Sequence, residues 1–467
     1  MSEQTESVDQ EADQPAEMDE ERPGIWELAF PSILSMLSFT FVGLVQTKFV
    51  GELGAQALAA VGAGQRVFFA MQAILMAVSA GTTALVARAW GAGDYTEASR
   101  VTMASLVLAG AFSAFVMVVG YFFAPAIAGV FGLDPATLKM ASDNIRWLCL
   151  FNVAFAINFI LSAALRASGD AWSPLWISGG VNLVNLPLLY LFVFGEFGFP
   201  RMGVAGAAIA AGISFSIGGA VLLGLWVKQK FRVKHVSGGW WRRERLRQLM
   251  NIGYPAAAEQ FVFQFGFFIF LMLIGNYYGT EAFAAYNIGA NMLMVCMTVG
   301  FGFSIAGATL VGQHLGANDF EGASRAGWRA TGMAALSMGA LGGVIALFAN
   351  ELAGFFLGDE TLTIKYTVQF IYIMAAVTPL MAIEFSIGGS LRGAGDTRFP
   401  LMATFLGLIV MRCGLAALAT YLGVPVFWVY AALVGDYVLK AILLTLRFRS
   451  GRWKTAVRIE GPGYQGA

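Results

Sequence analysis

Hydrophobic residues occur along this chain in long blocks, which are separated by short stretches rich in Gly, Pro and charged residues. Each block reaches at least ~18 residues, the length that an α-helix needs to cross a bilayer. The pattern therefore predicts an all-α polytopic membrane protein with twelve transmembrane helices. Several blocks exceed ~20 residues, which predicts tilted, bent or extended helices. The predicted bounds are 25–48, 57–87, 101–125, 141–165, 172–195, 203–227, 248–275, 283–311, 327–349, 365–391, 399–422 and 425–447.

Basic residues are distributed unevenly between the two ends of these helices. Lys and Arg near membrane spans favour the cytoplasmic side. If the first helix starts inside, 21 of the 29 basic residues lie on the inner side, 4 lie on the outer side and 4 lie within the spans. We therefore expect a multi-pass protein of the cell (inner) membrane with both termini in the cytoplasm.

The chain also repeats itself. ALVARAWGAGDYTEASR at 84–100 matches TLVGQHLGANDFEGASR at 309–325 in 8 of 17 positions, at an offset of 225 residues. LRASGDAWSPL at 165–175 returns as LRGAGDTRFPL at 391–401, at an offset of 226. Six spans bring the chain back to its starting side, so the halves are predicted to be parallel repeats related by an axis along the membrane normal.

The repeat divides the chain into two lobes with a tail at each end. The first 24 residues are acidic and polar and contain no apolar h-region, so we expect a disordered cytoplasmic tail and no cleavable signal peptide. The basic linker KQKFRVKHVSGGWWRRERLR is interpreted as a solvated cytoplasmic segment rather than a specific lipid site. The predicted organisation is tail 1–24, N-lobe 25–227, linker 228–247, C-lobe 248–447 and tail 448–467.

Composition excludes several functional classes. The chain is 58% hydrophobic, 12% charged and has a formal net charge of zero, which gives no global attraction for nucleic acid. Its three cysteines lie inside apolar blocks and are expected to be free, buried hydrophobic side chains. The chain has only two histidines, so it offers few ligands for a zinc site and few candidates for the base of a Ser-His catalytic site. We expect no enzyme and no cofactor.

The repeated LRxxGD loop contains the Arg and Asp most open to a catalytic interpretation. Its duplication at the inner ends of two spans favours a structural role instead. We expect the Arg to mark the cytoplasmic boundary and to pair with the Asp of the same loop. The Gly would permit the tight turn, and the Pro would open the next helix.

Two equivalent bundles are typical of transporters that work by alternating access. The paired motifs LVARAWGAGDYTEASR and LVGQHLGANDFEGASR, and LRASGD and LRGAGD, resemble those of the multidrug and toxic compound extrusion (MATE) family of NorM-like and DinF-like proteins. The resemblance covers about residues 25–447. It implies a twelve-helix antiporter, expected to be a monomer in contact with membrane lipids, that exports small organic and often cationic compounds in exchange for Na⁺ or H⁺.

Two acids inside the predicted spans are the candidate ion-coupling residues. Charges within a span are costly and usually functional. Glu259, one turn after Pro255, and Glu384, eight residues before Arg392, are each placed roughly 12 Å inside the membrane at ~1.5 Å per residue. We expect them to share one cavity of the C-lobe that binds a proton or Na⁺. The resemblance supports this pair, because the family places essential acids in these two helices.

Other polar residues are candidates for the cavity or for substrate contact. In the C-lobe these are Gln260, Gln264, Asn287 and Asn291, each of which alternatively forms an interhelical hydrogen bond.

In the N-lobe, Gln46 and Asn185 stand where DinF-type relatives carry acids, so a proton relay in that lobe is doubtful. Lys48 is interpreted as an interfacial residue paired with Glu52. Arg66 either neutralises an acid such as Glu384 or lines the cavity.

Three further charges fall within the last two spans. Asp436 and Lys440, four residues apart, are expected to neutralise each other, and Arg412 is assigned a packing or interfacial role. Because both signs occur inside the spans, substrates are expected to be selected by shape and apolar contact. The alternative function is a flippase or exporter of lipid-linked or other amphipathic precursors from the same superfamily, which would favour a strongly basic cavity.

Overall fold

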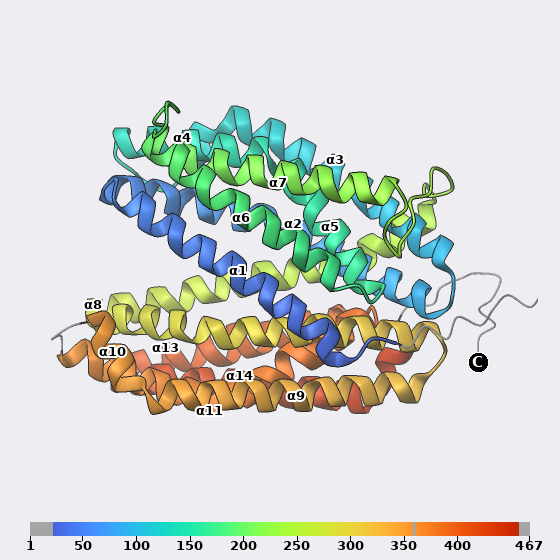
Figure 1. Cartoon of the computed structure of the whole chain (residues 1–467). Coiled ribbons are helices and arrows are strands. Elements are labelled where there is room, and N and C mark those ends of the chain that lie inside the picture. Colours follow the sequence, from blue (N-terminus) through green and yellow to red (C-terminus); the bar gives the residue numbers. More distant parts are fainter. Residues whose placement is uncertain (1–21, 358–360, 457–467) are drawn as a thin grey trace, which may run out of the picture.

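The computed structural model describes residues 22–357 and 361–456, and within these residues the secondary structure is helical, without β-strands (Figure 1). The predicted tails lie largely outside the described residues. The first half forms α1 (Ile25–Gly51), α2 (Ala55–Gly91), α3 (Tyr95–Gly129), α4 (Pro135–Leu150), α5 (Asn152–Ala167), α6 (Trp172–Phe194) and α7 (Gly203–Val227). The second half forms α8 (Arg243–Gly316), α9 (Phe320–Leu347), α10 (Ala349–Leu357), α11 (Thr361–Gly393), α12 (Arg398–Thr404), the π-helix η1 (Phe405–Cys413), α13 (Gly414–Tyr421), α14 (Val426–Arg449) and the short 3₁₀ turn η2 (Arg452–Thr455).

Helix α8 is two membrane helices joined end to end. Its 74 residues would span ~110 Å at ~1.5 Å per residue, several times the ~30 Å hydrocarbon core. The helix breaks at Gly279, whose φ of 83° and ψ of −177° are not helical. A glycine adopts this backbone without the steric cost of a Cβ. The break gives two arms, 243–278 and 280–316, which correspond to two of the predicted spans.

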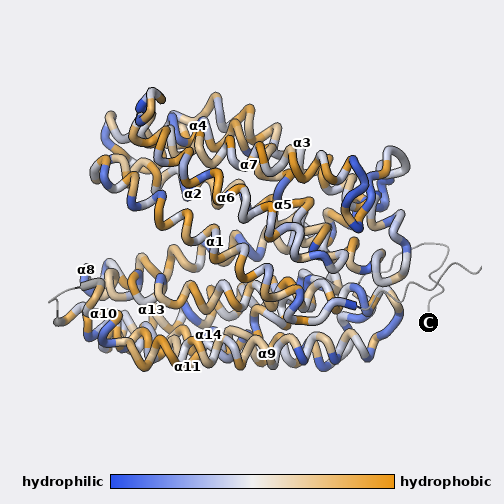
Figure 2. The backbone as a smooth tube through the Cα atoms, viewed as in Figure 1, coloured by the Kyte–Doolittle hydropathy of each residue, from blue (hydrophilic) through white to orange (hydrophobic). Residues whose placement is uncertain are grey.

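The twelve-span architecture is confirmed once these joints are resolved. Ten helices are long and apolar enough to cross a membrane, with α8 counted once, and α4 with α5 forms an eleventh span bent by 48°. The second arm of α8 is the twelfth. Figure 2 shows that hydrophobic positions run along the helices, whereas hydrophilic positions gather mainly near their ends.

Three local features depart from the predicted spans. The predicted helix 141–165 is interrupted at Phe151, whose φ of −89° and ψ of 3° are not helical. The predicted helix 399–422 contains the π-helical segment η1. The short helix α10 follows α9 directly, where the prediction ended at 349. The length of a hydrophobic block indicates only whether a segment can cross the membrane. It therefore predicts none of these three features.

The internal repeat is visible in the backbone. Asp94 caps α3 by accepting a hydrogen bond from the Glu97 amide, and Asp319 caps α9 by accepting one from the Gly322 amide. Both LRxxGD loops close in the same way. The amide of Asp170 donates to the Leu165 carbonyl, and that of Asp396 donates to the Leu391 carbonyl, each over 2.9 Å.

The N-lobe (α1–α7) and the C-lobe (α8–α14) lie side by side and meet towards one end, which we call the closed end (Figure 1). There α2 and the first arm of α8 cross closely. A methyl group added to Gly81 would lie 2.9 Å from the Leu249 carbonyl oxygen, and one added to Gly253 would lie 2.8 Å from that of Ala77. Small residues permit this approach between helices. Both ends of the described chain also lie here, since Arg22 contacts His314 and Arg88 donates to the Lys454 carbonyl.

Candidate functional site

Glu259 lies on the first arm of α8, one turn beyond Pro255, and is bound by two other helices. The Arg392 guanidinium of α11 donates to Oε1 and Oε2 over 3.0 and 3.3 Å, and the Thr404 hydroxyl of α12 donates over 3.3 Å. Arg392 also contacts the Ser304 hydroxyl, 3.4 Å away on the second arm of α8. The Glu259 side chain is 18% exposed, so this carboxylate is neutralised and partly shielded from the surroundings.

Glu384 lies on α11 and has a different basic partner. Lys440 of α14 donates to its Oε1 over 2.9 Å. The same ammonium lies 3.1 Å from Asp436, one turn away on its own helix, which confirms the predicted pairing of these two residues. Lys440 and Asp436 are fully buried, whereas Glu384 keeps 20% of its side chain exposed. Glu384 is therefore the most exposed residue in a cluster of otherwise buried charges.

Arg412 is the fourth member of this cluster. The sequence predicted a packing or interfacial role for it, whereas the structure gives it a specific ion-pair partner. It forms an ion pair with Asp436, and its guanidinium lies 5.2 Å from the centre of the Tyr437 ring. Arg412 is carried by the π-helix η1. In the same segment Gly407 faces Asp436 and Lys440, and a methyl group there would lie 2.7 Å from the Lys440 Cγ. The absence of a side chain at Gly407 lets η1 approach α14.

The six charged groups sum to zero. Three acids, Glu259, Glu384 and Asp436, face three bases, Arg392, Lys440 and Arg412. An unpaired charge inside a membrane protein is expensive, so pairing explains how this lobe tolerates six of them. We call these residues the C-lobe charge network.

The predicted Arg–Asp pair within the repeated loop is wrong for the second copy. Arg392 reaches Glu259, whereas Asp396 of the same loop binds Arg447 of α14 over 2.8 Å. Spacing along the loop suggested a local pair, but the arginine extends into the lobe, where a partly buried carboxylate competes for it. In the first copy, Asp170 accepts from the Ser173 amide, in the first turn of α6, over 2.9 Å.

The two candidate acids bind different bases. Among the described residues no hydrogen bond or ion pair joins Glu259 to Glu384 directly. Glu384 is neutralised by Lys440 rather than by Arg66, which is exposed on α2 and forms no ion pair in the described part of the chain. Lys48 is likewise exposed, and its predicted pair with Glu52 is absent from these residues.

The candidate amides of the second arm of α8 bond within their own helix. The Asn287 amide donates to the Phe283 carbonyl over 2.8 Å, and that of Asn291 donates to the Asn287 carbonyl over 2.9 Å. On the first arm, Gln260 is half-buried and Gln264 is exposed. The Asn side chains therefore leave their carbonyl oxygens available, but they do not link helices through their amide groups.

The N-lobe has a polar seam between α1 and α6 that sequence reasoning missed. The Asn182 amide donates to the Ser38 hydroxyl over 2.7 Å, and the Ser178 hydroxyl lies 3.3 Å from that of Ser35. Asn185 is buried with an unpartnered Oδ1, and Gln46 is half-buried. These side chains do not titrate.

The described residues contain no group of three or more His, Cys, Asp or Glu side chains arranged to hold a metal ion. The three cysteines are free and buried, as predicted.

Polar contacts between the lobes occur at the closed end. Arg245, at the start of α8, donates to both carboxylate oxygens of Glu97 on α3, each over 2.7 Å. Arg245 is 3% exposed, and it also donates to the carbonyls of Gly239 and Trp240 over 2.9 and 2.6 Å. Nearby, the Gln313 amide donates to the Ala167 carbonyl over 2.9 Å. We call the Glu97–Arg245 pair the interlobe latch.

Comparison with known proteins agrees with the internal repeat. The family model MatE matches twice, at residues 31–191 and 255–418. A "Probable multidrug resistance protein NorM" of Thermotoga maritima is 29% identical over 448 residues, which covers 94% of each chain. The "Uncharacterized transporter YisQ" of Bacillus subtilis is 24% identical over 434 residues, covering 92% of this chain and 94% of that protein.

Solved structures show the same fold. A crystal structure of MATE in complex with MaL6 superposes with a TM-score of 0.85 at 22% identity, covering 91% of this chain and 95% of the other. A structure described as an outward-facing conformation of a multidrug resistance MATE family transporter superposes with a TM-score of 0.83 at 23% identity, covering 91% and 94%.

Proposed function

The chain belongs to the MatE family, and from this premise we propose that it is a secondary active antiporter that exports organic, often cationic, compounds in exchange for Na⁺ or H⁺. The relatives named as multidrug resistance proteins support the substrate class. The observation that carries the proposal is that two partly exposed carboxylates of one lobe, Glu259 and Glu384, are each paired with a base of another helix. Ionisable groups inside membrane spans mark ion pathways.

In this mechanism the resident bases hold the two carboxylates while no coupling ion is bound. Arg392 forms an ion pair with Glu259, and Lys440 forms one with Glu384. A proton or Na⁺ that binds to one of these carboxylates supplies the positive charge that the base had provided, and so weakens the ion pair. Arg392 also touches Ser304, so its release alters a contact that links α11 to both arms of α8. Ion binding is thereby coupled to the packing of the C-lobe.

The lobe contacts support alternating access. Hydrogen bonds that cross between the lobes, such as those of Arg245, Gln313 and Arg22, gather at the closed end. We assign this end to the cytoplasm, because 21 of the 29 basic residues and both termini fall on that side in the predicted topology. The described conformation is then outward-facing in the inner membrane. Transport requires the closed-end contacts to break while the opposite ends of the lobes approach.

The charge network also bears on substrate choice. Its acids are occupied by bases and its charges cancel, which supports selection of substrates by shape and apolar contact, with Glu259 and Glu384 reserved for the ion. A flippase of pyrophosphate-linked precursors would be favoured by an excess of basic groups. The balance of three acids and three bases favours the antiporter.

The test is transport by the purified chain in sealed proteoliposomes. An imposed inward Na⁺ or proton gradient should drive efflux of a fluorescent organic cation by the wild type. Glu259→Gln and Glu384→Gln remove one titratable carboxylate each and should abolish gradient-driven efflux, while each variant retains a neutral hydrogen-bonding side chain.

A matched control distinguishes loss of coupling from loss of an ion pair. Asp396→Asn breaks the Asp396–Arg447 pair, which has a similar length but lies just after the end of α11, outside the C-lobe charge network. This variant should keep gradient-driven efflux. Full efflux by both Gln variants would refute the coupling site, and failure of both gradients to drive any organic cation would refute the antiporter assignment.

A further inference from the structure

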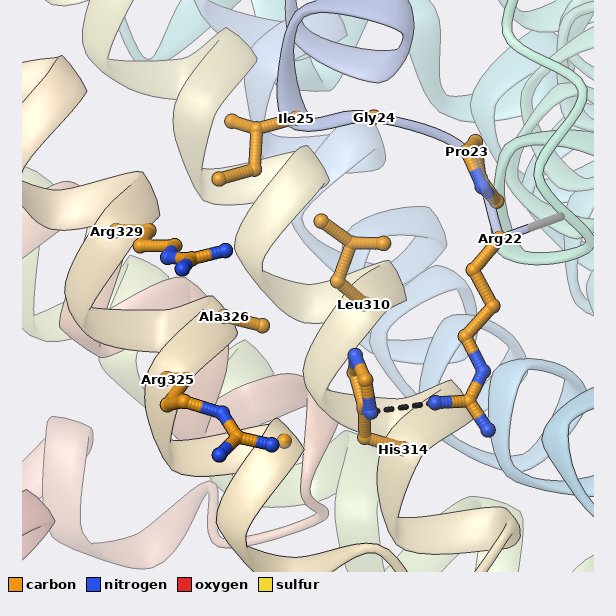
Figure 3. Close-up of a pocket in the computed structure, with 10 residues that line it drawn as sticks. Arg22, Pro23, Gly24, Ile25, Leu310, His314, Arg325, Ala326 and Arg329 are labelled. Atoms are coloured by element: carbon orange, nitrogen blue, oxygen red, sulfur yellow. Dashed lines mark hydrogen bonds between the residues drawn. The ribbon is translucent and has the colours of Figure 1, made fainter.

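A second polar site lies at the closed end, outside the charge network. A pocket of about 360 Å³ opens between the segment that leads into α1 and the facing sides of α8 and α9 (Figure 3). Arg22 approaches it from the segment that precedes α1, and His314, Arg325 and Arg329 approach it from the C-lobe. Three arginines and no acid line this pocket, which we call the seam pocket.

The arginines of the seam pocket are poorly neutralised. Arg325 is 66% exposed, and its only ion pair in the described part of the chain is a 3.9 Å contact with the 88% exposed Glu321. Arg329 has no ion-pair partner among the described residues. The Arg22 guanidinium lies 2.6 Å from the His314 Nδ1 and 3.5 Å from the Asp319 carboxylate.

Asp319 does not line the seam pocket and is already engaged elsewhere. Its carboxylate accepts from the Gly322 amide over 2.7 Å and lies 2.8 Å from the His314 ring nitrogen. The Gly322 amide, and then the His314 side chain, hold the pKa of Asp319 below its usual value. Asp319 therefore caps α9 rather than lining the pocket, and the residues that line the pocket keep an excess of positive charge.

The internal repeat shows what occupies the equivalent place in the other lobe. At the offset of 225 residues, Arg325 corresponds to Arg100, and Gly322 corresponds to Glu97. In the first half the Glu97 carboxylate binds the neighbouring Arg245 at two points. In the second half Arg325 remains and Arg329 stands where the first half has Ala104, but the residue in place of that carboxylate is a glycine without a side chain. The seam pocket thus presents bases without the acid that its counterpart supplies.

We propose that the seam pocket binds the phosphate group of an anionic ligand through Arg22, Arg325 and Arg329. Arginine guanidinium groups bind phosphate oxygens with charge-assisted and often bidentate hydrogen bonds. The remaining wall includes Ile25, Leu310 and other apolar groups, which suits the glycerol region of a phospholipid as well as a free phosphate. Because Arg22 leads into α1 of the N-lobe and the other two arginines belong to α9 of the C-lobe, the bound anion joins the two lobes at the closed end.

The experiment measures thermal unfolding of the full chain in detergent, titrated with inorganic phosphate at constant ionic strength or with mixed micelles containing phosphatidylglycerol. Chloride and phosphatidylcholine are the respective controls. We expect phosphate-type anions to raise the unfolding midpoint. Arg325→Gln and Arg329→Gln should each weaken apparent binding about fivefold, and the double variant about 25-fold, at roughly 1 kcal/mol per basic residue. Arg247→Gln, an exposed arginine of the first arm of α8, should leave binding unchanged.

The outcomes separate the two sources of phosphate. Stabilisation by both probes shows that the phosphate group suffices, and stabilisation by phosphatidylglycerol alone assigns the pocket to a lipid headgroup. Equal stabilisation of the wild type and the double variant by every probe would overturn the proposal. So would an arginine-dependent stability that needs no added phosphate and is lost on deletion of residues 2–20, because the acidic N-terminal segment would then be the occupant.

Discussion

The interlobe latch is expected to set the balance between the two orientations of the transporter. Glu97→Gln removes the negative charge but keeps a side chain of similar size. Arg245 then stays buried at 3% exposure, where it faces a neutral amide with one acceptor oxygen in place of a carboxylate with two, beside the Gly239 and Trp240 carbonyls. A hydrogen bond to a charged group contributes about 1.5–3 kcal/mol, and the latch has two such bonds of 2.7 Å.

Hydration reduces the net effect of this substitution. When the closed end opens, both latch groups return to water and recover the solvation that they lose in the closed form. We therefore expect the latch to favour the described conformation by about 2 kcal/mol in net terms. At 1.4 kcal/mol per tenfold, its loss should shift the equilibrium about 30-fold towards the inward-facing form.

Distances between the lobes provide the assay. Spin labels on Gln56 of α2 and Tyr277 at the end of the first arm of α8, both exposed and at the far end, should lie closer together in the inward-facing form. The three native cysteines are buried, which limits background labelling. Pulsed-resonance distance distributions should show a larger short-distance population in Glu97→Gln than in the wild type.

The control for this prediction is Glu321→Gln, near the start of α9. Its ion pair with Arg325 is 3.9 Å long and exposed, so its loss should leave the distance distribution unchanged. A wild-type distribution in Glu97→Gln would refute the reasoning. A shift of equal size in Glu321→Gln would also refute it, because general loss of charge at the closed end would then be the cause.

Three further predictions concern other parts of the molecule. Arg392→Gln frees Glu259 for the coupling ion, so the ion concentration for half-maximal transport should fall about tenfold; an unchanged or higher value in the proteoliposome assay would contradict this. The pKa of Asp319 is lower in the folded chain than its ordinary value of 3.8. The contribution of Asp319 to the stability of the fold is therefore fully present above pH 3.8 and is lost as the pH falls through the pKa of the folded state. The difference in unfolding midpoint between the wild type and Asp319→Ala should therefore be constant at neutral pH and shrink in acid, rather than grow. Gly279→Ala forces a Cβ into a φ of 83° and should reduce stability by about 1–2 kcal/mol in denaturant unfolding, whereas Gly62→Ala, with open space around the added methyl group, should not.

Block length and charge placement predicted the architecture because the bilayer imposes strong constraints. Every backbone group in lipid must be paired within a helix, so long apolar blocks become helices. The repeated motifs then identified two lobes. Local geometry was harder to predict, since neither block length nor hydrophobic periodicity indicates the bend at Phe151 or the π-helix η1.

The candidate acids were identified for a similar reason, but their partners were not. Glu259 and Glu384 stood out because charges inside a span are rare. Spacing along one helix also predicted the pair of Asp436 with Lys440, and this pair is present. It did not predict that Lys440 also binds Glu384 of another helix, or that Arg392 leaves its loop for Glu259. Such partners depend on how helices far apart in sequence pack together.

The neutrality of the C-lobe charge network has an electrical consequence. Moving one elementary charge through a membrane potential of ~100 mV changes the free energy by about 2.3 kcal/mol. In the proposed antiporter, the six charges of this network cancel, so they add no such cost when the empty transporter reorients. Voltage then acts on the charges of the bound ion and of the exported compound, and the resting potential accelerates only the steps in which the transporter carries a net charge. The exchange of one monovalent ion for one monovalent organic cation would generate no current.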